Sequence, residues 1–424
     1  MIILGIIMIL AGIKVYGQSL PHLTIQQVYE LARKNYPLIK QRDLITKTSA
    51  YTVSNAAKGY LPALSVNGQA TYQSTVTSFP FSIPIPGFSL PKYSRDQYKV
   101  YGEIDQVIYD GGIIKNQKQS AETNEVIQQQ NLDVELYALY DRVNQLFFGI
   151  LLMNEQLKQN TLLKDDIQNG IDKAKALVAN GTAYRSSVDE LSAQLLQTDQ
   201  SRIELIATKK AYLDMLSLFI NIPLNENSIL EKPVASITSD NINRPELRLY
   251  DEQKKIYDLQ EQLLKAQLRP KFGLFLQEGY GRPGLNPLSN DFAWYYIGGV
   301  KLSWNLSSLY TLRNQRKLLD INRNSLDIQK ETFLFNTGIT QKQQSAGIEK
   351  FSELFKKDNA IIALRESVKK AASAQLENGV LSAHDYITEV NAEDQARQNF
   401  ILHEIQLLQE QYNYKSTVGN ITNN

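Results

Sequence analysis

The chain has 424 residues, a formal net charge of +1 and no cysteine. The balanced charge gives no reason to expect a nucleic-acid partner, and the lack of cysteine excludes disulfides, thiolate metal sites and a lipidated N-terminal cysteine. Its three histidines, His22, His384 and His403, do not have the spacing of metal ligands.

The first segment is an apolar run from Ile2 to Ile13, followed by a mixed stretch that ends at Gly17. This pattern predicts a cleaved secretory signal over residues 1–17. A membrane anchor is the alternative, but the run is shorter than the roughly 20 residues that span a bilayer. No later segment has that many consecutive apolar residues either, so any membrane crossing must use strands.

A first structural repeat is expected over 18–220. It begins with a helix from Leu23 to about Lys58, in which Thr24 and Gln27 have capping-box spacing and Pro37 causes an interruption. Two strands follow, at about 62–73 and 98–109, on either side of a proline-rich loop. Their alternation of apolar and polar residues is typical of transmembrane β-barrel strands, although a half-buried soluble strand has it too.

A long helix is predicted next, over about 111–179, with a return helix over about 187–220. The apolar residues of the long helix alternate in steps of four and three from Leu132 to Leu157, which is a heptad seam. At about 1.5 Å per residue this helix is roughly 100 Å long and needs partner helices to bury the seam. Asp110-Gly111-Gly112 at its start indicates a strand-to-helix turn rather than a phosphate site, because no lysine follows at P-loop spacing.

The pattern then repeats. After a linker over 221–243, the second structural repeat is expected over 244–417, with strands at about 271–281 and 292–304, a long helix over about 307–377 and a return helix over about 382–417. Pro245 lies 208 positions after Pro37 (245 − 37), and Pro270 lies 208 positions after Pro62 (270 − 62). The equal spacing within the chain indicates a tandem duplication. Residues 418–424 are expected to be a disordered tail.

Four strands are too few to close a membrane barrel, because the smallest known have about eight. Open strand edges do not occur in lipid. If these strands span a membrane, several copies must share one barrel, and their helices must form a shared tube. Trp294, Tyr296 and Trp304 suit an interfacial aromatic girdle, with a soluble core as the alternative interpretation.

An ordered set of short motifs resembles the TolC-type outer membrane efflux protein family. The set covers essentially the whole mature chain and comprises the Leu23 to Pro37 opening, Tyr60-Leu61-Pro62 before a strand, Val107 to Gly112 at a strand end, and two Asn-Gly turns followed by Ser187–Leu191 and Ala383–Ile387. The resemblance implies a mixed α and transmembrane β fold. Each subunit of a homotrimer would give four strands to a 12-stranded barrel in the outer membrane of a Gram-negative bacterium, continued by a long periplasmic α-helical barrel.

The resemblance also implies partners and sites. The partners are outer membrane lipid, a periplasmic adaptor (membrane fusion) protein and an inner-membrane efflux or secretion transporter. The adaptor would dock at the tips Asn180, Gly181, Asn378 and Gly379. Asp385, six residues past Gly379, matches a gate aspartate of the family; Thr388 stands where a second aspartate is found, and Asp189 is the nearest equivalent in the first repeat. Alternatively, Asp385 is only an exposed carboxylate that favours a helix N-terminus.

The sequence has no nucleophile–base set, no metal cluster and no nucleotide loop, so we predict passive conduction of solutes rather than an enzyme, with no cofactor. An alternative function is that of a periplasmic coiled-coil structural or adaptor protein that bridges membranes. A tube component of a phage or secretion machine is a third possibility.

Overall fold

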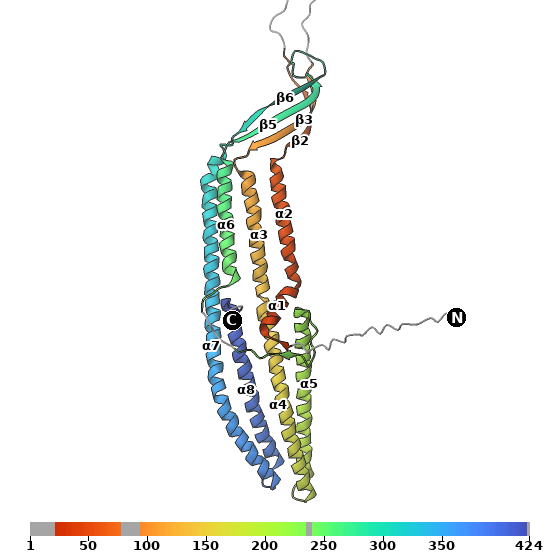
Figure 1. Cartoon of the computed structure of the whole chain (residues 1–424), viewed down its shortest axis with the longest axis vertical. Coiled ribbons are helices and arrows are strands. Elements are labelled where there is room, and N and C mark those ends of the chain that lie inside the picture. Colours follow the sequence, from red (N-terminus) through yellow and green to blue (C-terminus); the bar gives the residue numbers. More distant parts are fainter. Residues whose placement is uncertain (1–21, 78–93, 235–239, 422–424) are drawn as a thin grey trace, which may run out of the picture. The chain divides into compact units, whose positions relative to one another are not determined.

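The computed structural model describes residues 22–77, 94–234 and 240–421, and the predicted signal at 1–17 lies outside them. Helices predominate in this part of the chain, and none of them combines the length and hydropathy that crossing a bilayer requires. The elements, labelled in Figure 1, are β1 (His22–Leu23), α1 (Ile25–Asn35), η1 (Pro37–Lys40), α2 (Gln41–Ala57), η2 (Lys58–Tyr60), β2 (Ala63–Tyr72), β3 (Asp96–Tyr109), α3 (Ile113–Tyr137), α4 (Leu139–Ala179), α5 (Arg185–Ile220), β4 (Ile229–Leu230), α6 (Pro245–Gln267), β5 (Lys271–Arg282), β6 (Ala293–Ser303), α7 (Ser308–Glu377) and α8 (Ala383–Val418).

The chain forms two compact units, and each combines pieces of both sequence repeats. The helical unit contains residues up to 39, 134–245 and 333–424; the sheet unit contains residues 40–133 and 246–332. The repeats expected at 18–220 and 244–417 therefore do not correspond to separate compact domains. Instead, each unit combines helices or strands of both repeats, as in the pairing of β3 with β5.

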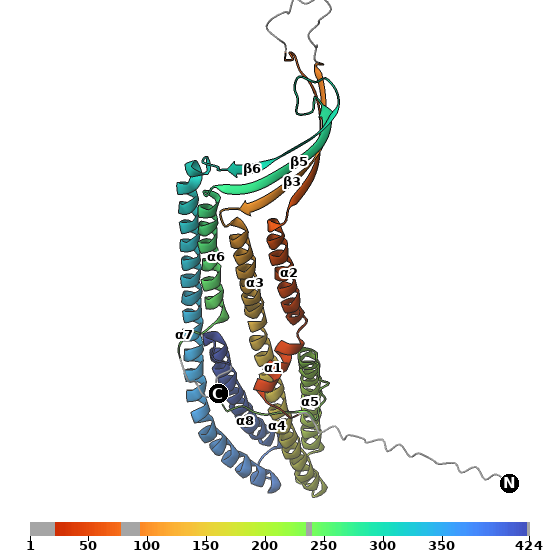
Figure 2. The same ribbon diagram turned by 45° about the horizontal axis from the view of Figure 1, so that its top comes forward.

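The sheet unit contains a four-stranded antiparallel sheet in the order β2-β3-β5-β6, whose bent strands run side by side in Figure 2. β3 and β5 come from different repeats, so the two repeats meet at the central strand pair of the sheet. β2 and β6 are the edge strands, and each has a hydrogen-bonded neighbour on one side only among the described residues. The sheet thus has two open edges.

In this sheet the apolar face is more exposed than the polar face, which is the reverse of a water-soluble sheet. The register places Leu64, Ile104 and Leu276 in one row, so the apolar positions of all four strands share a face. This apolar face is exposed: Val66 is 83% and Trp294 75% accessible. Many positions on the polar face, including Glu103 and Gln277, are only partly accessible. A water-soluble sheet normally buries the apolar face.

The Asp110-Gly111-Gly112 segment is a strand-to-helix turn, as predicted. The Asp110 carboxylate accepts hydrogen bonds from the backbone N–H groups of Gly112 (2.7 Å) and Ile114 (2.6 Å), and so caps α3. Gly111 has a φ of +77°, and a Cβ there would lie 2.6 Å from the Ala266 carbonyl oxygen. Only glycine allows this close approach between the two repeats.

The helical unit begins with the predicted capping box. The Thr24 backbone N–H donates to Gln27 Oε1 (3.0 Å), and the Gln27 N–H donates to Thr24 Oγ1 (3.3 Å). The helix ends at Asn35, before Pro37. α1 then packs against α4 and α5 in a core that includes Phe147, Phe148 and Leu216.

The structure differs from the prediction of one helix over 111–179, because α3 and α4 are separated at Ala138. The break lies beside Tyr137, whose hydroxyl donates to the Ser416 carbonyl (2.7 Å). The Arg244 guanidinium lies over the Tyr137 ring, with its Cζ 4.2 Å from the ring centroid. The predicted seam is nonetheless largely buried: Leu136, Leu139 and Val143 on either side of the break all point into the protein.

Two other expectations need correction. The linker expected over 221–243 contains β4, which pairs in parallel with β1 and places Leu224 and Leu230 in the helical core. The tail expected to be disordered from Val418 is ordered through Ile421: Val418 is buried, and Gly419, at φ +87°, lets the Asn420 N–H donate to the Lys415 carbonyl (2.9 Å). This C-cap motif anchors the end of the chain. Residues 422–424 lie outside the described part.

Candidate functional site

Two tight turns at one end of the helical unit form the candidate site, and they have the same geometry. Gly181 (φ +72°) lies just after the end of α4 in the α4–α5 turn, and Gly379 (φ +70°) just after the end of α7 in the α7–α8 turn. In the first, the Thr182 N–H donates to Leu177 O; in the second, the Val380 N–H donates to Gln375 O, both at 2.9 Å. These are Schellman caps, which need a left-handed residue and explain the glycine in each Asn-Gly pair.

Behind the turns, a small apolar core joins the two hairpins. Tyr386 is the central residue: its ring packs on Gly170 of α4, where a Cβ would lie 2.5 Å from Tyr386 Cε1. The Tyr386 hydroxyl donates to the Asp166 carbonyl (3.0 Å), and burial raises the pKa of Tyr386 to about 12. The other buried members are Ile167, Ile171, Ala174, Leu191, Ala372, Leu376, Ala383, Ile387 and Val390.

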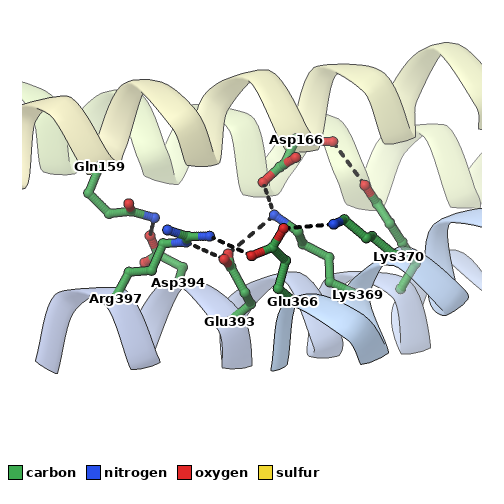
Figure 3. A network of polar contacts seen from close by, with 9 residues as sticks. Gln159, Asp166, Glu366, Lys369, Lys370, Glu393, Asp394 and Arg397 are labelled. Atoms are coloured by element: carbon green, nitrogen blue, oxygen red, sulfur yellow. Dashed lines mark hydrogen bonds and ion pairs between the residues drawn. The ribbon is translucent and has the colours of Figure 1, made fainter. Parts of the chain in front are cut away.

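Next to this core lies a partly buried ionic network, drawn in Figure 3, which links α4, α7 and α8 around the buried Glu393. Lys369 of α7 pairs with Asp166 of α4 (2.7 Å) and with Glu393 of α8 (3.2 Å). Glu393, only 1% exposed, also pairs with Arg397. Arg397 in turn reaches Glu366 of α7 at 3.4 Å. The network therefore connects the three helices through contacts that centre on one buried carboxylate.

The charge states of the network follow from its geometry. Burial disfavours the ammonium of Lys369, but its hydrogen bonds and ion pairs with Asp166 and Glu393 outweigh this and raise its pKa. Asp394 accepts a hydrogen bond from the Gln159 side chain (2.9 Å), yet burial raises its pKa. Lys369 is therefore held charged, whereas the Asp394 carboxyl takes up its proton at a higher pH than an ordinary aspartate does.

The predicted gate residues Asp385 and Thr388 lie on the exposed side of α8, in its first two turns. The Asp385 N–H donates to Ser382 Oγ (3.1 Å), and the Ser382 hydroxyl contacts Asp385 Oδ2 (2.6 Å). Thr388 donates its hydroxyl to the His384 carbonyl (3.0 Å). Asp385 thus takes part in a helix cap and keeps its carboxylate at the surface.

Asp189, the predicted counterpart in the first hairpin, is exposed at the start of the second turn of α5. Among the described residues no hydrogen bond or ion pair joins Asp189 to Asp385. Their chain neighbours meet instead: His384 Nδ1 lies 2.8 Å from Glu190 Oε1. Hydrogen bonding and charge attraction from Glu190 raise the pKa of His384, with a smaller contribution from Asp385. This contact links the two hairpins at their tips.

An open groove runs between α4 and α7 close to the turns. Lys173 lies in it, paired with Glu377 (2.9 Å) and hydrogen-bonded to the Ser373 hydroxyl (2.9 Å); Asn180 is also part of its lining. Tyr184 and Val380, beside the turns, are 84% and 77% exposed. The end of the unit therefore presents apolar side chains next to a polar groove. Within the described ranges, no three potential ligand side chains are arranged to hold a metal ion.

The three predicted girdle residues lie in the sheet unit. Trp294 and Tyr296 are on β6, on the exposed apolar face, and Trp304 follows the end of that strand. The Trp304 indole N–H donates to the Leu268 carbonyl (2.9 Å). Trp294 lies next to Tyr280, with 5.3 Å between ring centroids. Aromatic side chains are therefore found at both ends of the strand.

Comparisons with known proteins agree with this architecture. The family model described as outer membrane efflux protein matches residues 28–214. The fold is similar to that of the outer membrane protein VceC of Vibrio cholerae (TM-score 0.65, 12% identity, covering 93% of this chain and 96% of that one). It is also similar to the CmeC outer membrane channel of Campylobacter jejuni (TM-score 0.64, 12% identity, 94% and 86%) and to the MtrE outer membrane channel of Neisseria gonorrhoeae (TM-score 0.63, 12% identity, 94% and 89%).

The resemblance to TolC-type outer membrane efflux proteins is confirmed. Among curated proteins, none matches this sequence. The family is one of channels rather than enzymes.

Sequence reasoning missed the residues that join the two hairpins of the helical unit. A usable signal was present: Glu393 lies seven residues after Tyr386, so a carboxylate occupies a position of the apolar seam of α8. Gly170 was a second signal, because a glycine inside a long helix often marks a close approach. Neither pattern identifies the residue that Glu393 or Gly170 contacts, because that depends on which helices are neighbours in the fold.

Proposed function

We propose that this protein is the outer membrane duct of an export system, in which three copies form one 12-stranded barrel continued by a tube of helices into the periplasm. The observation that carries the proposal is the sheet whose apolar face is exposed and whose edges β2 and β6 are both open. Lipid would cover the apolar face, and neighbouring copies would pair with the edges, so no backbone group is left unpaired in the bilayer.

The dimensions of the strands support this arrangement. Trp294 and Trp304 are ten residues apart (304 − 294), or roughly 33 Å along an extended strand. With the tilt of about 40° usual for barrel strands, that becomes about 25 Å across the membrane, the height of the apolar band of outer membrane barrels. Trp294, Tyr296 and Trp304 would then lie at the two interfaces, and polar residues such as Glu103 would line the lumen.

The hairpin turns are proposed as the docking end. Exposed apolar residues beside a polar groove suit a protein partner, and we assign the periplasmic adaptor to Asn180, Gly181, Asn378 and Gly379 and the groove around Lys173. The adaptor in turn would connect the duct to an inner-membrane efflux or secretion transporter. The chain contains no cysteine, so Asn180→Cys and Asn378→Cys each introduce a unique cross-linking site for capturing these partners.

The same end is proposed to contain the gate. Three copies of Asp385, and of Thr388 one turn later, would face the axis of the tube, with Asp189 on the neighbouring hairpin. The ionic network of Asp166, Lys369 and Glu393 would hold the α7–α8 hairpin against α4 in the closed state. Opening then requires that hairpin to move away from α4, which breaks these contacts.

Ion conductance of the purified protein in planar lipid bilayers tests the proposal. We expect detergent-dependent oligomers that conduct, with a conductance raised by changes that loosen the tips. A monomeric, water-soluble protein that leaves the bilayer sealed would contradict the proposal and favour a periplasmic adaptor. An oligomer found in the outer membrane fraction distinguishes the duct from that alternative.

A further inference from the structure

Two tyrosines occupy one row on the polar face of the sheet. Tyr101 of β3 pairs with Gly279 of β5, and Gly279 pairs with Tyr295 of β6. A Cβ at Gly279 would lie 2.9 Å from the Tyr295 hydroxyl oxygen and 2.5 Å from Tyr101 Cβ. The Tyr295 ring therefore extends across the glycine toward Tyr101. Both tyrosines remain partly accessible.

Charged residues precede and follow this row on the same face of β3. Asp105, Glu103, Tyr101 and Lys99 alternate along the strand, so successive members are about 7 Å apart. The two carboxylates lie toward the helix end of the strand and Lys99 toward the loop end. Along β3, a cation that moves from the helix end passes two negative charges, then the tyrosine row, and then a positive charge. Lys301 of β6 and Lys271 of β5 lie on the same face at the helix end, beyond Asp105.

A purely structural role accounts for only part of this arrangement. An aromatic ring that covers a cross-strand glycine stabilises a sheet, and the Phe275 ring covers Gly299 in this way, with Cε1 3.0 Å from a Cβ placed there. That role explains the position of Tyr295. It does not explain Tyr101, whose atom nearest to Gly279 is its Cβ rather than its ring. The ring of Tyr101 is available for another contact.

We propose that Tyr101 and Tyr295 form a contact site in the lumen for solutes that combine an aromatic ring with a positive charge. The inference rests on the proposed function, because the lumen exists only when three copies close the barrel. Tyrosine rings attract aromatic rings through offset or edge contacts and attract cations through their negative faces. Glu103 and Asp105 supply the charge that brings such a solute to the row.

The test compares two blockers of the ion current, benzyltriethylammonium and tetraethylammonium, which have the same charge and differ by one phenyl ring. We expect the wild-type channel to bind the benzyl compound more tightly, by about two- to ten-fold. The double variant Tyr101→Ser/Tyr295→Ser should bring this ratio close to one. Tyr295→Phe retains the ring and should retain the ratio.

Tyr72→Ser is the matched control, because Tyr72 of β2 is an exposed tyrosine that lies on the opposite, apolar face. It should leave the ratio unchanged. If Tyr295→Ser prevents assembly of a heat-resistant oligomer, Tyr101→Ser alone applies the same test. A conducting double variant with the wild-type ratio would overturn the inference and leave the duct intact, whereas a wild-type protein that does not conduct would overturn the duct itself.

Discussion

His384 gives the tips a contact that depends on pH. Because Glu190 and Asp385 stabilise the imidazolium, the pKa of His384 is raised above its ordinary value. The ion pair with Glu190 is therefore fully formed below the ordinary histidine pKa and is lost as pH rises through the raised value. We expect the His384 titration, followed by NMR, to move to lower pH in Glu190→Gln.

Asp189 provides the control for this prediction, since it is the neighbour of Glu190 and is also exposed. Asp189→Asn should shift the titration of His384 much less than Glu190→Gln does. Equal shifts in the two variants would mean that the general negative charge of the tips, and not the contact of 2.8 Å, sets the pKa of His384.

Gly170 is a second single residue with a testable role. Its alanine variant would place a Cβ 2.5 Å from a ring carbon of Tyr386, a side chain that is 2% exposed and cannot move away freely. We expect Gly170→Ala to destabilise the packing of α4 against α8 by about 1–3 kcal/mol, the usual cost of overpacking. Loss of the helical circular dichroism signal on heating measures it.

The comparison for Gly170 is Gly338, a glycine inside α7 at which an added Cβ meets no atom within 4 Å. There the substitution removes only the low helix propensity of glycine, so Gly338→Ala should stabilise by up to about 1 kcal/mol. If both variants lowered the melting temperature equally, steric contact with Tyr386 would not be the cause.

At the scale of the elements, helix ends and strand alternation could be read from local sequence. Gly181 and Gly379 adopt positive φ, which glycine does at little cost, so an Asn-Gly pair after a heptad seam predicts the turn. The apolar residues of β2 alternate regularly, and so identify a strand and its faces. These features depend on residues close together in the chain.

Other elements could not be predicted because they depend on distant partners. β4 is only two residues long and forms because Ile229 and Leu230 meet β1, some 200 positions earlier in the chain. The ordered end at Asn420 depends on Gly419, whose added Cβ would lie 2.3 Å from the Asn243 carbonyl oxygen. Likewise, nothing in the sequence distinguishes Lys369 from other lysines, because its partners on α4 and α8 come beside it only in the folded chain.

Lys369 also allows a prediction about how these helices are held together. Its side chain is 16% exposed, and its removal would leave Asp166 without this counter-charge and Glu393 with Arg397 alone. Breaking a fully buried pair typically costs about 3–5 kcal/mol, and the partial exposure of Asp166 makes the cost here smaller, about 1–3 kcal/mol. We expect Lys369→Met to speed amide hydrogen exchange in α7 and α8 near the turns and, in the proposed duct, to raise the conductance.

Lys370→Met is the control for Lys369→Met, because Lys370 is the next residue, carries the same charge and has a side chain that is 73% exposed. Its pair with Glu366 is at the surface and contributes at most about 1 kcal/mol. Faster exchange in this variant to the same extent would show that the loss of one positive charge, and not the buried network, loosens the hairpin.

At the scale of the whole molecule, duplication along the chain and packing in space follow different rules. The repeats order the elements, but apolar faces decide which of them pack together. β3 therefore pairs with β5, and α4 packs against α8, across the two repeats. Neither repeat completes a sheet or a helical core by itself. In the proposed barrel, further copies of the chain would extend the same principle, because β2 and β6 each have one unpaired edge among the described residues.

A charge placed on the apolar face tests this principle for the proposed barrel. Val300 of β6 is 72% exposed and lies between Trp294 and Trp304, within the band that lipid would cover. An arginine near the middle of that band costs about 2–4 kcal/mol in a membrane barrel. We expect Val300→Arg to reduce the amount of heat-resistant oligomer in outer membrane fractions. The effect should be large, because one substitution would place three arginines in a barrel of three copies.

Ile297 supplies the comparison, since it is an aliphatic residue of the same strand on the opposite, polar face, in one row with Gln277 and Glu103. In a barrel its side chain faces water, so Ile297→Arg should assemble almost as well as the wild type. A soluble protein responds differently. There Val300→Arg would only add charge to an exposed surface, and the two variants would accumulate equally in the periplasm. The difference between these neighbouring substitutions therefore reports directly which face of the sheet meets lipid.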